Sequence, residues 1–139
     1  MRDEDEIHRL AQVVRSTRDA VLSKDLDGVI TSWNPAAIRL YGYSEVEAVG
    51  AHISLLIPAD RKNEEQEILA RVRRGEAVQT YETERIRKDG ARINVSLTIS
   101  PIEHPQRGIV GASVIARDIT AESRRRHAEI GRASCRERV

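Results

Sequence analysis

The residues of this sequence best suited to catalysis or metal binding are four histidines and one cysteine: His8, His52, His104, His127 and Cys135. Imidazole and thiolate groups bind metals or act as bases and nucleophiles only where several of them converge on one site. These five are scattered over unrelated segments, without a His-x-x-x-His pair, a Gly-x-Ser-x-Gly turn or a Gly-rich phosphate loop. The sequence therefore predicts no metal site and no enzymatic activity of its own. A single cysteine also excludes a disulfide framework within the chain.

Residues 32–50, SWNPAAIRLYGYSEVEAVG, combine an Asn-Pro pair, two glycines and a Ser-x-x-Glu motif within a short polar stretch. Taken alone, its polar side chains could line an active-site loop. They are also helix signals, because Asn34 can cap free N–H groups, Pro35 suits the first helical position and Gly42 can adopt a left-handed stop. The Ser-x-x-Glu motif that begins at Ser44 is a capping box, and a further glycine follows it. The stretch is therefore predicted to form two very short helices, with its polar residues as scaffold.

A longer helix is predicted from a cap at Asp60 to about Arg74, with Gly75 as its stop. Arginines near its end suit the negative end of the helix dipole. The buried side of this helix is predicted to consist of Ile68, Leu69 and Val72.

The remaining segments around these helices alternate in the manner of strands. Residues 20–25 and 29–33 form two short runs joined at Asp27-Gly28, which is a strong hairpin signal. Three longer runs follow the helices: AVQTYETERIR, ARINVSLTISPI and IVGASVIARDIT. The apolar positions of the middle run, which alternate with polar ones, are Ile93, Val95, Leu97 and Ile99. The order of elements predicts an α+β sheet whose helices cluster between the second and third strands.

Residues 5–18 have the spacing of an amphipathic helix, with apolar positions at i, i+3, i+4 and i+7. This apolar stripe consists of Ile7, Leu10, Ala11 and Val14. The stripe must pack against another apolar surface. A sheet face of the same chain and a second copy of the helix are both open at this stage.

The composition of the 139 residues indicates one domain with an aliphatic core, because the chain contains no Phe, three Tyr and one Trp. Few rings are available to stack on bases, which argues against a single-stranded nucleic-acid-binding protein. No apolar run approaches the length of a membrane span, and the charged N-terminus is unlike a secretion signal. We therefore expect a cytoplasmic protein without nucleic-acid or membrane partners.

Four segments, in this order, resemble the PAS sensor domains of bacterial signalling proteins: DLDGVITSWNPAAIRLYGYS, VGAHISLLIPADR, RKDGARINVSLTISPI and IVGASVIARDIT. The match covers about residues 16–121. The resemblance implies a PAS fold, with a five-stranded antiparallel sheet in the order 2-1-5-4-3 and short helices plus one longer helix on one face. It also implies a regulatory input module that is usually attached to a histidine kinase, a cyclic-dinucleotide enzyme or a transcription regulator.

The expected organisation is an amphipathic helix over residues 1–18, a PAS domain over 19–121, the start of an exit linker over 122–128 and a tail over 129–139. The tail, EIGRASCRERV, is interpreted as the translation of a sequencing-adapter oligonucleotide; a solvated basic tail or the start of a linker helix is the alternative. Without it the chain has 20 basic and 20 acidic residues, so its slight basicity disappears. A natural chain cut near Ala128 would have lost an output domain.

The resemblance also allows cofactor classes to be sorted by residue. Light-sensing flavin domains of this family carry a reactive cysteine where this chain has GAHISLLIP, so cysteinyl-flavin chemistry is not expected. Haem sensors use a histidine on or just after the long helix, and none lies between Asp60 and Arg85. Non-covalent flavin is disfavoured only mildly, by the lack of rings. The cofactor remains unknown, a small apolar ligand stays open, and we expect a colourless protein.

A cavity between helices and sheet would have an aliphatic wall suited to an acyl chain or a small apolar metabolite. The alternative, which we favour, is that these side chains simply fill the core. The ligand-pocket candidates are Trp33, Asn34, Tyr41, Ile68, Leu69, Val72, Tyr81, Val95, Leu97, Ile99 and Val114.

Two functional hypotheses follow. In the first, a ligand-gated sensor passes a change through Asp118, Ile119 and Thr120 into the following helix. In the second, a ligand-free module dimerises through the N-terminal helix and the sheet face and relays a signal through the same exit. A two-component system is the expected setting for both.

Overall fold

The structure is a computed structural model that describes residues 18–126 of the chain. The predicted helix over residues 5–18, with its stripe of Ile7, Leu10, Ala11 and Val14, lies outside the described residues except for Arg18. The elements are β1 (Ala20–Asp25), β2 (Ile30–Trp33), α2 (Pro35–Tyr41), α3 (Glu45–Ala48), η1 (Ile53–Leu56), η2 (Ala59–Arg61), α4 (Asn63–Arg73), β3 (Val78–Ile86), β4 (Arg92–His104) and β5 (Gly108–Asp118). Residues 120–126 are helical and follow β5 directly.

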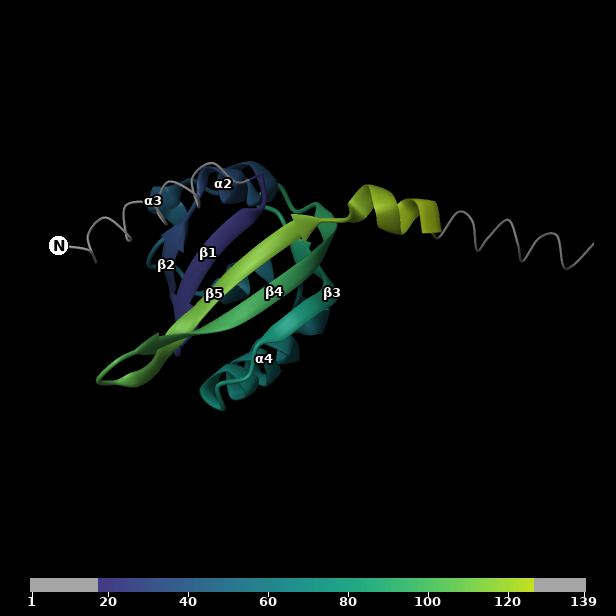
Figure 1. The fold of residues 1–139 in the computed structure, drawn as a ribbon. Helices are drawn as coiled ribbons and strands as arrows, with labels where there is room; N and C mark the ends of the chain where they lie inside the picture. The colour runs from purple at the N-terminus through teal and green to yellow at the C-terminus, as the bar shows by residue number, and fades with distance from the viewer. Residues whose placement is uncertain (1–17, 127–139) are drawn as a thin grey trace, which may run out of the picture.

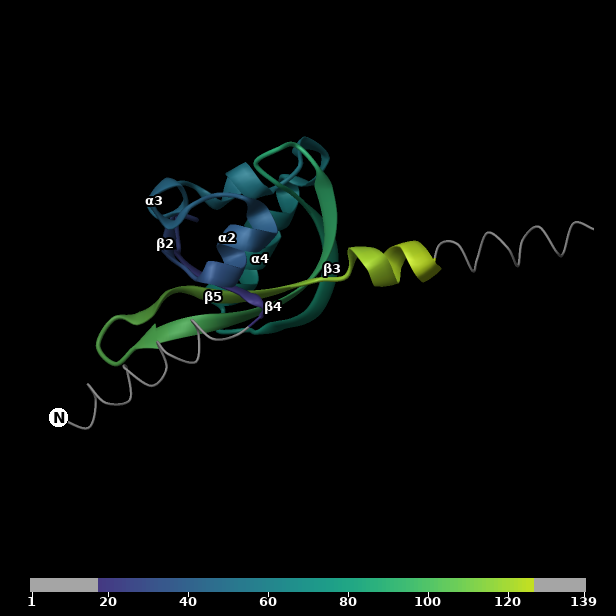
Figure 2. The ribbon, with the colours of Figure 1, turned by 90° about the horizontal axis from the view of Figure 1, so that it is seen from above.

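The five strands form one antiparallel sheet in the order β2-β1-β5-β4-β3, which confirms the predicted topology (Figure 1). The helices between β2 and β3 gather over one face of this sheet, as Figure 2 shows from above. Residues 120–126 project away from the end of the sheet, beyond the edge formed by β3 and β4. The sheet therefore has one face covered by the described helices and leads directly into an exit helix.

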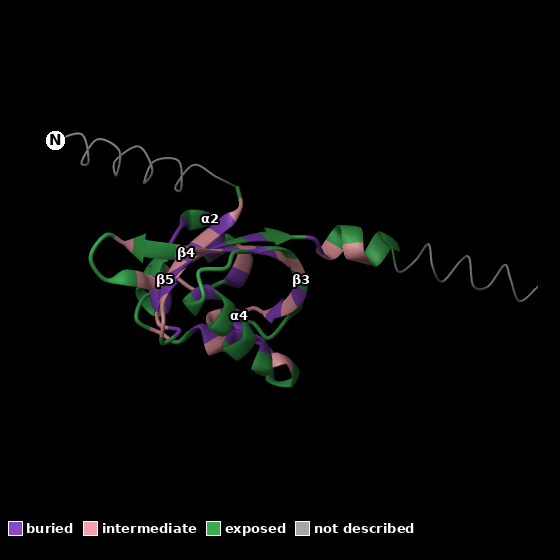
Figure 3. Cartoon of the chain, turned by 60° about the horizontal axis from the view of Figure 1, so that its bottom comes forward, coloured by how far each residue is buried: buried purple, intermediate pink, exposed green. Residues whose placement is uncertain are grey.

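The core lies between the sheet and these helices (Figure 3). The alternation predicted for β4 is confirmed, because the positions from Ile93 to Ile99 alternate between buried apolar and half-buried polar side chains. The pleat places every second side chain on the helix-covered face. Leu22 on β1 and Val114 on β5 extend the same buried layer across neighbouring strands.

The local signals of residues 32–50 form the predicted helices. The side chain of Asn34 accepts the N–H of Ala37, Pro35 is the first residue of α2, and Gly42 ends α2 with a φ of 85°. The Ser44 side chain and its partner Glu47 form a complete capping box at the start of α3. These signals act over three or four residues, which explains why they could be recognised without tertiary information.

The predicted start of the long helix at Asp60 was wrong. Residues 59–61 form a 3-10 turn, and α4 begins at Asn63 after Lys62, which provides no side-chain cap. The Asp60 carboxylate instead accepts hydrogen bonds of 3.1 Å from Arg92 Nη2, on β4. A charge-assisted contact with a distant strand has replaced the local cap.

Within the described residues, no helix is both long and apolar enough to cross a membrane.

Candidate functional site: a buried charge cluster and the exit segment

The space between helices and sheet, where a ligand cavity was considered, is almost filled. The remaining interior gap has a volume of about 20 Å³, which is about the room that one water molecule needs. Its walls are Leu22, Lys24, Tyr41, Ile53, Leu56, Glu65, Ile68, Arg85, Leu97, Ile99 and Val114. Three of these residues are charged, which the aliphatic wall expected from the sequence did not include.

Lys24 and Glu65 form a buried ion pair beside this gap. Lys24 follows Ala20 and Leu22 on the buried face of β1, and Glu65 shares the buried face of α4 with Ile68. The Lys24 Nζ donates to both carboxylate oxygens, at 2.7 and 2.8 Å, and the two residues are only 3% and 6% exposed. Burial lowers the pKa of Lys24, although the Glu65 carboxylate opposes this shift.

Glu64, the neighbour of Glu65, is the centre of a second cluster. The Thr83 hydroxyl lies 2.7 and 2.8 Å from its two oxygens, while Arg85 Nη1 and Arg61 Nη1 donate to it at 3.2 and 3.1 Å. Burial by itself would raise the pKa of the Glu64 carboxyl. The hydrogen bonds from Thr83 and Arg61, and the charge of Arg85, outweigh it and lower that pKa. Glu64 is therefore held as a carboxylate.

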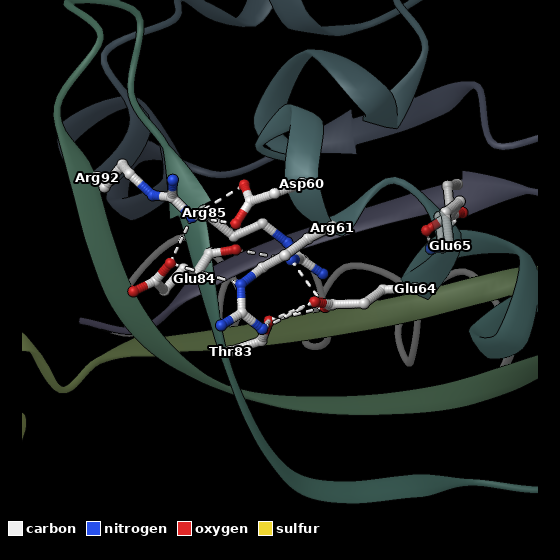
Figure 4. Close-up of polar contacts among 9 residues, drawn as sticks. Asp60, Arg61, Glu64, Glu65, Thr83, Glu84, Arg85 and Arg92 are labelled. Carbon is white, nitrogen blue, oxygen red and sulfur yellow. Dashed lines mark hydrogen bonds and ion pairs between the residues drawn. The ribbon is translucent and has the colours of Figure 1, made fainter.

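The charges continue from Glu64 to the molecular surface along β3 (Figure 4). Arg61 Nε lies 3.4 Å from a Glu84 carboxylate oxygen, and Arg92 donates to Glu84 and to Asp60. Since each group contacts the next, Glu64 on α4 is connected through charged side chains to residues of the edge strand β3 and its neighbour β4.

The exit segment starts where β5 ends. The backbone of Ile119 donates to the Asn94 carbonyl at 2.8 Å, and the Asn94 N–H donates to the Thr120 hydroxyl at 3.0 Å. The Asp118 carboxylate accepts the Thr120 N–H at 2.9 Å, which forms an Asx turn just before the helix over residues 120–126. The start of the exit helix is thus attached to Asn94 on β4 through the Ile119 N–H and the Thr120 hydroxyl, and the Ile119 side chain is buried.

Five of the sequence-predicted pocket residues border the interior gap: Tyr41, Ile68, Leu97, Ile99 and Val114. Val72 and Val95 are fully buried in the core without lining it, and Tyr81 packs against the core from β3. Burial raises the pKa of Tyr41 to about 12 and also raises that of Tyr81. Whether these residues contact a ligand remains a prediction.

The other three candidates have different neighbours. Trp33 donates from Nε1 to the Tyr43 carbonyl at 3.0 Å, and its ring lies 5.4 Å from that of Tyr41. Asn34 accepts from Val21 and Ala37 as a scaffold residue. Leu69, expected on the buried side of α4, is half-buried and lines a groove on the outer side of that helix.

The two histidines in the described residues hold turns together. His52 Nδ1 accepts the Ser54 N–H at 3.1 Å, and its Nε2 lies 3.0 Å from the Asp27 carbonyl. These contacts assign the proton to Nε2. His104 Nδ1 accepts from two backbone N–H groups in the turn between β4 and β5. Among residues 18–126 no group of three or more His, Cys, Asp or Glu side chains is arranged to hold a metal ion.

A family profile described as "PAS domain" matches residues 18–121, which is most of the chain. The chain belongs to the PAS domain family. The predicted resemblance and the predicted fold class are thereby confirmed, and the segment from β1 to Asp118-Ile119-Thr120 coincides with the matched range.

The curated proteins to which this PAS domain is similar include sensory and two-component proteins. The signal transduction histidine-protein kinase AtoS of Escherichia coli is 32% identical over 91% of this chain, which spans 22% of that kinase. The sensor protein FixL of Bradyrhizobium diazoefficiens is 28% identical over 68% of this chain and 19% of its own length. The chain thus spans about a fifth of these relatives. It is homologous to a sensory segment of larger signalling proteins.

Solved structures agree with this fold. The PAS domain of a Colwellia psychrerythraea protein superimposes with a TM-score of 0.75 at 30% identity, over 83% of this chain and 98% of that one. An RNA-binding light-oxygen-voltage receptor reaches a TM-score of 0.78 at 23% identity, covering 91% of this chain and 37% of the receptor. At that identity the second comparison supports the fold alone.

A flavin or a haem does not fit the interior of this PAS domain. Binding pockets for molecules of that size have volumes of several hundred Å³, whereas the gap here is about 20 Å³. The gap is also bordered by the Lys24–Glu65 pair and by Arg85, and Tyr41 is the one aromatic residue in its wall.

Sequence reasoning missed the charge clusters of this PAS domain, although the signal was present. Lys24, Thr83 and Arg85 occupy the buried phase of strands that were otherwise recognised, and Glu65 lies three residues before Ile68 on the helix face assigned to the core. These clusters could have been predicted from polar residues that stand at positions where the pattern predicts apolar ones.

Proposed function

We propose that this PAS domain is the non-catalytic input and relay module of a two-component signalling protein, and that it acts on an output domain following the exit helix. The sizes and names of the curated relatives support this proposal, because the chain matches only a segment of proteins that include a histidine kinase.

The observation that carries the proposal is the position of Asn94. In the sheet register, Asn94 on β4 lies opposite Glu84 on β3, a member of the charge network that reaches Glu64. On its other side, Asn94 bonds to Ile119 and Thr120 at the start of the exit helix. A shift of α4 relative to β3 is therefore transmitted to the exit helix through one strand position. A signal can shift the populations of two alternative arrangements of such a packed network.

Between the two functional hypotheses, the filled interior favours a relay that does not depend on a large cofactor between helices and sheet. The gap of about 20 Å³ supports this choice. A visible absorption spectrum of the purified protein should show no flavin or haem band, and such a band at stoichiometric intensity would contradict the proposal.

The relay is tested in a chimera that joins residues 1–126 in frame to the kinase part of the Escherichia coli relative. Thr120→Val removes the hydroxyl that accepts the Asn94 N–H and keeps the side-chain shape. We expect a several-fold change in the rate of autophosphorylation with an unchanged fold by circular dichroism. Thr98→Val, the same replacement on β4 at the position opposite Ile115, is the control. Equal rates in wild type and Thr120→Val would refute the relay through this segment.

A further inference from the structure

A groove with a volume of about 470 Å³ lies on the outer side of α4, distinct from the interior gap. It runs between α4, the turn that joins β1 to β2, and η1 with the residues that follow it. Its lining residues are Leu26, Asp27, His52, Ser54, Ile57, Lys62, Glu65, Gln66, Leu69 and Arg73. The volume is in the range of small-molecule sites.

The groove follows the length of α4. Lys62, Leu69 and Arg73 are separated by seven and four residues, so they lie on one face of the helix, with Glu65 and Gln66 between them. At a rise of 1.5 Å per residue, this face extends over about 16 Å from Lys62 to Arg73. Leu26, Ile57 and Leu69 make the middle of the groove apolar. The shape therefore suits an elongated molecule with an aliphatic body.

The charges of the groove favour an anion at its Lys62 end. Glu65 is neutralised by Lys24 on its inner side, with both carboxylate oxygens engaged. None of the ion pairs among the described residues involves the exposed Lys62. The opposite end carries Asp27, together with Arg73, which donates to the Leu26 carbonyl at 3.0 Å. Neither Lys62 nor Arg73 has an ion-pair partner among the described residues, but the Arg73 guanidinium donates to the Leu26 carbonyl, so the Lys62 ammonium is the groove cation that no described group engages.

We propose that the groove binds a small aliphatic carboxylate. The alkyl chain lies on Leu26, Ile57 and Leu69, and the carboxylate pairs with the Lys62 ammonium. Burial of the alkyl chain supplies affinity, because it removes apolar surface from water. The ion pair supplies the selectivity for an acid over a neutral or basic molecule of the same length.

Glu65 gives this site a connection to the interior. It lines both the groove and the interior gap, and it is bonded to Lys24 on β1. A ligand in the groove therefore contacts the residue that holds α4 to the sheet. The binding site stands without the proposed relay, whereas an effect of the ligand on the exit helix rests on it.

Binding is tested with octanoate as the probe, added to the purified chain, with octanol and octylamine as probes of equal length. We expect octanoate to bind with a Kd of about 1 mM or lower, and octylamine to bind about two- to fivefold more weakly because the exposed Lys62 ammonium repels it. Backbone amide shifts in nuclear magnetic resonance spectra should concentrate at residues 26–27, 52–57 and 62–73.

Two variants separate the roles of charge and shape. Lys62→Met removes the exposed ammonium and keeps the length of the side chain, so octanoate affinity should fall by about two- to fivefold while octanol binding is unchanged. Leu69→Gln should weaken both octanoate and octanol, because it makes the middle of the groove polar. Lys88→Met, which removes an exposed lysine outside the groove, is the matched control and should leave binding unchanged.

Equal binding of octanoate and octylamine, shifts confined to the outer sheet face, or no binding at 10 times the expected Kd of about 1 mM would each overturn the proposed site. The chimeric kinase distinguishes the two proposals. If octanoate binds the chain as described but Thr120→Val leaves autophosphorylation unchanged, the relay fails and the site stands; if Thr120→Val alters autophosphorylation but octanoate does not bind, the site fails and the relay stands.

Discussion

At the scale of single residues, the unusual feature of this PAS domain is the placement of charges where the chain pattern calls for apolar side chains. Lys24 and Glu65 are both almost completely buried and are bonded to each other. Desolvation of two charges costs several kcal/mol, and their attraction recovers this cost only in good geometry. The pair is therefore better explained as a device that fixes the position of α4 on β1 than as a source of stability.

This explanation predicts a marked asymmetry between single and double variants. Lys24→Met leaves the Glu65 carboxylate buried without its partner and should lower the free energy of unfolding by about 3 kcal/mol. Lys24→Met combined with Glu65→Leu should recover to within about 1 kcal/mol of the wild type, because neither charge then remains. Urea unfolding followed by circular dichroism measures both. Additive losses in the double variant would contradict the prediction.

A second residue-scale prediction concerns Glu47. Hydrogen bonds from Lys88 and Ser44 lower the pKa of the Glu47 carboxyl from 4.5 to about 2. Because the folded pKa lies below the unfolded one, the stabilisation is complete above pH 4.5 and is lost as the pH falls towards 2. In Lys88→Met the pKa of Glu47, measured by nuclear magnetic resonance titration, should rise towards 4.5, and the loss of stability over this pH window should become smaller. Lys62→Met should leave the pKa of Glu47 unchanged; a rise there as well would point to a general charge effect.

At the scale of elements, the turn between β1 and β2 combines a local signal with a tertiary contact. Gly28 has a φ of 86°, which disfavours any side chain, and a Cβ at this position would lie 2.7 Å from His52 Nε2. His52 in turn is bonded to the Asp27 carbonyl of the same turn. The turn is thus fixed both by its own backbone and by a ring from the segment that leads into η1.

Gly28→Ala and Gly90→Ala form a matched pair that separates these two effects. Gly90 has a φ of 89° and no atom within 4 Å of an added Cβ, so its replacement should cost only the backbone strain, about 1–2 kcal/mol. Gly28→Ala should cost about 1 kcal/mol more, because His52 must move and lose its hydrogen bond. In a His52→Ala background the two replacements should lower the free energy of unfolding, measured by urea unfolding, by the same amount. A persistent difference in that background would assign it to something other than the histidine.

At the scale of the whole molecule, the described helices between β2 and β3 cover one face of the sheet, and none of the helices within residues 18–126 covers the other. Ile115 on β5 points to that second face and is 40% exposed. The apolar stripe expected over residues 5–18 and this face are the two surfaces from which we propose a homodimer.

Light scattering after gel filtration tests the dimer. The full chain should have the mass of a dimer, while Ile115→Lys and deletion of residues 1–17 should each shift it towards the monomer, because a charge or the loss of apolar surface destabilises an apolar interface. Val46→Lys, at a position that is 92% exposed on α3, is the control and should remain dimeric. A monomeric full chain would remove the homodimer from the proposal.

Features that depend on neighbours along the chain could be predicted from the amino-acid sequence. The caps at Asn34 and Ser44 and the alternation in β4 are set by contacts over a few residues, and the sheet order followed from the family resemblance. Contacts between distant groups became visible in the folded chain alone: Lys24 with Glu65 across 41 positions, Asp60 with Arg92 across 32, and Leu69 with the groove beside α4. The size of the interior gap also depends on the tertiary structure, because it is the space that side chains from β1, α4 and β4 leave when they pack together.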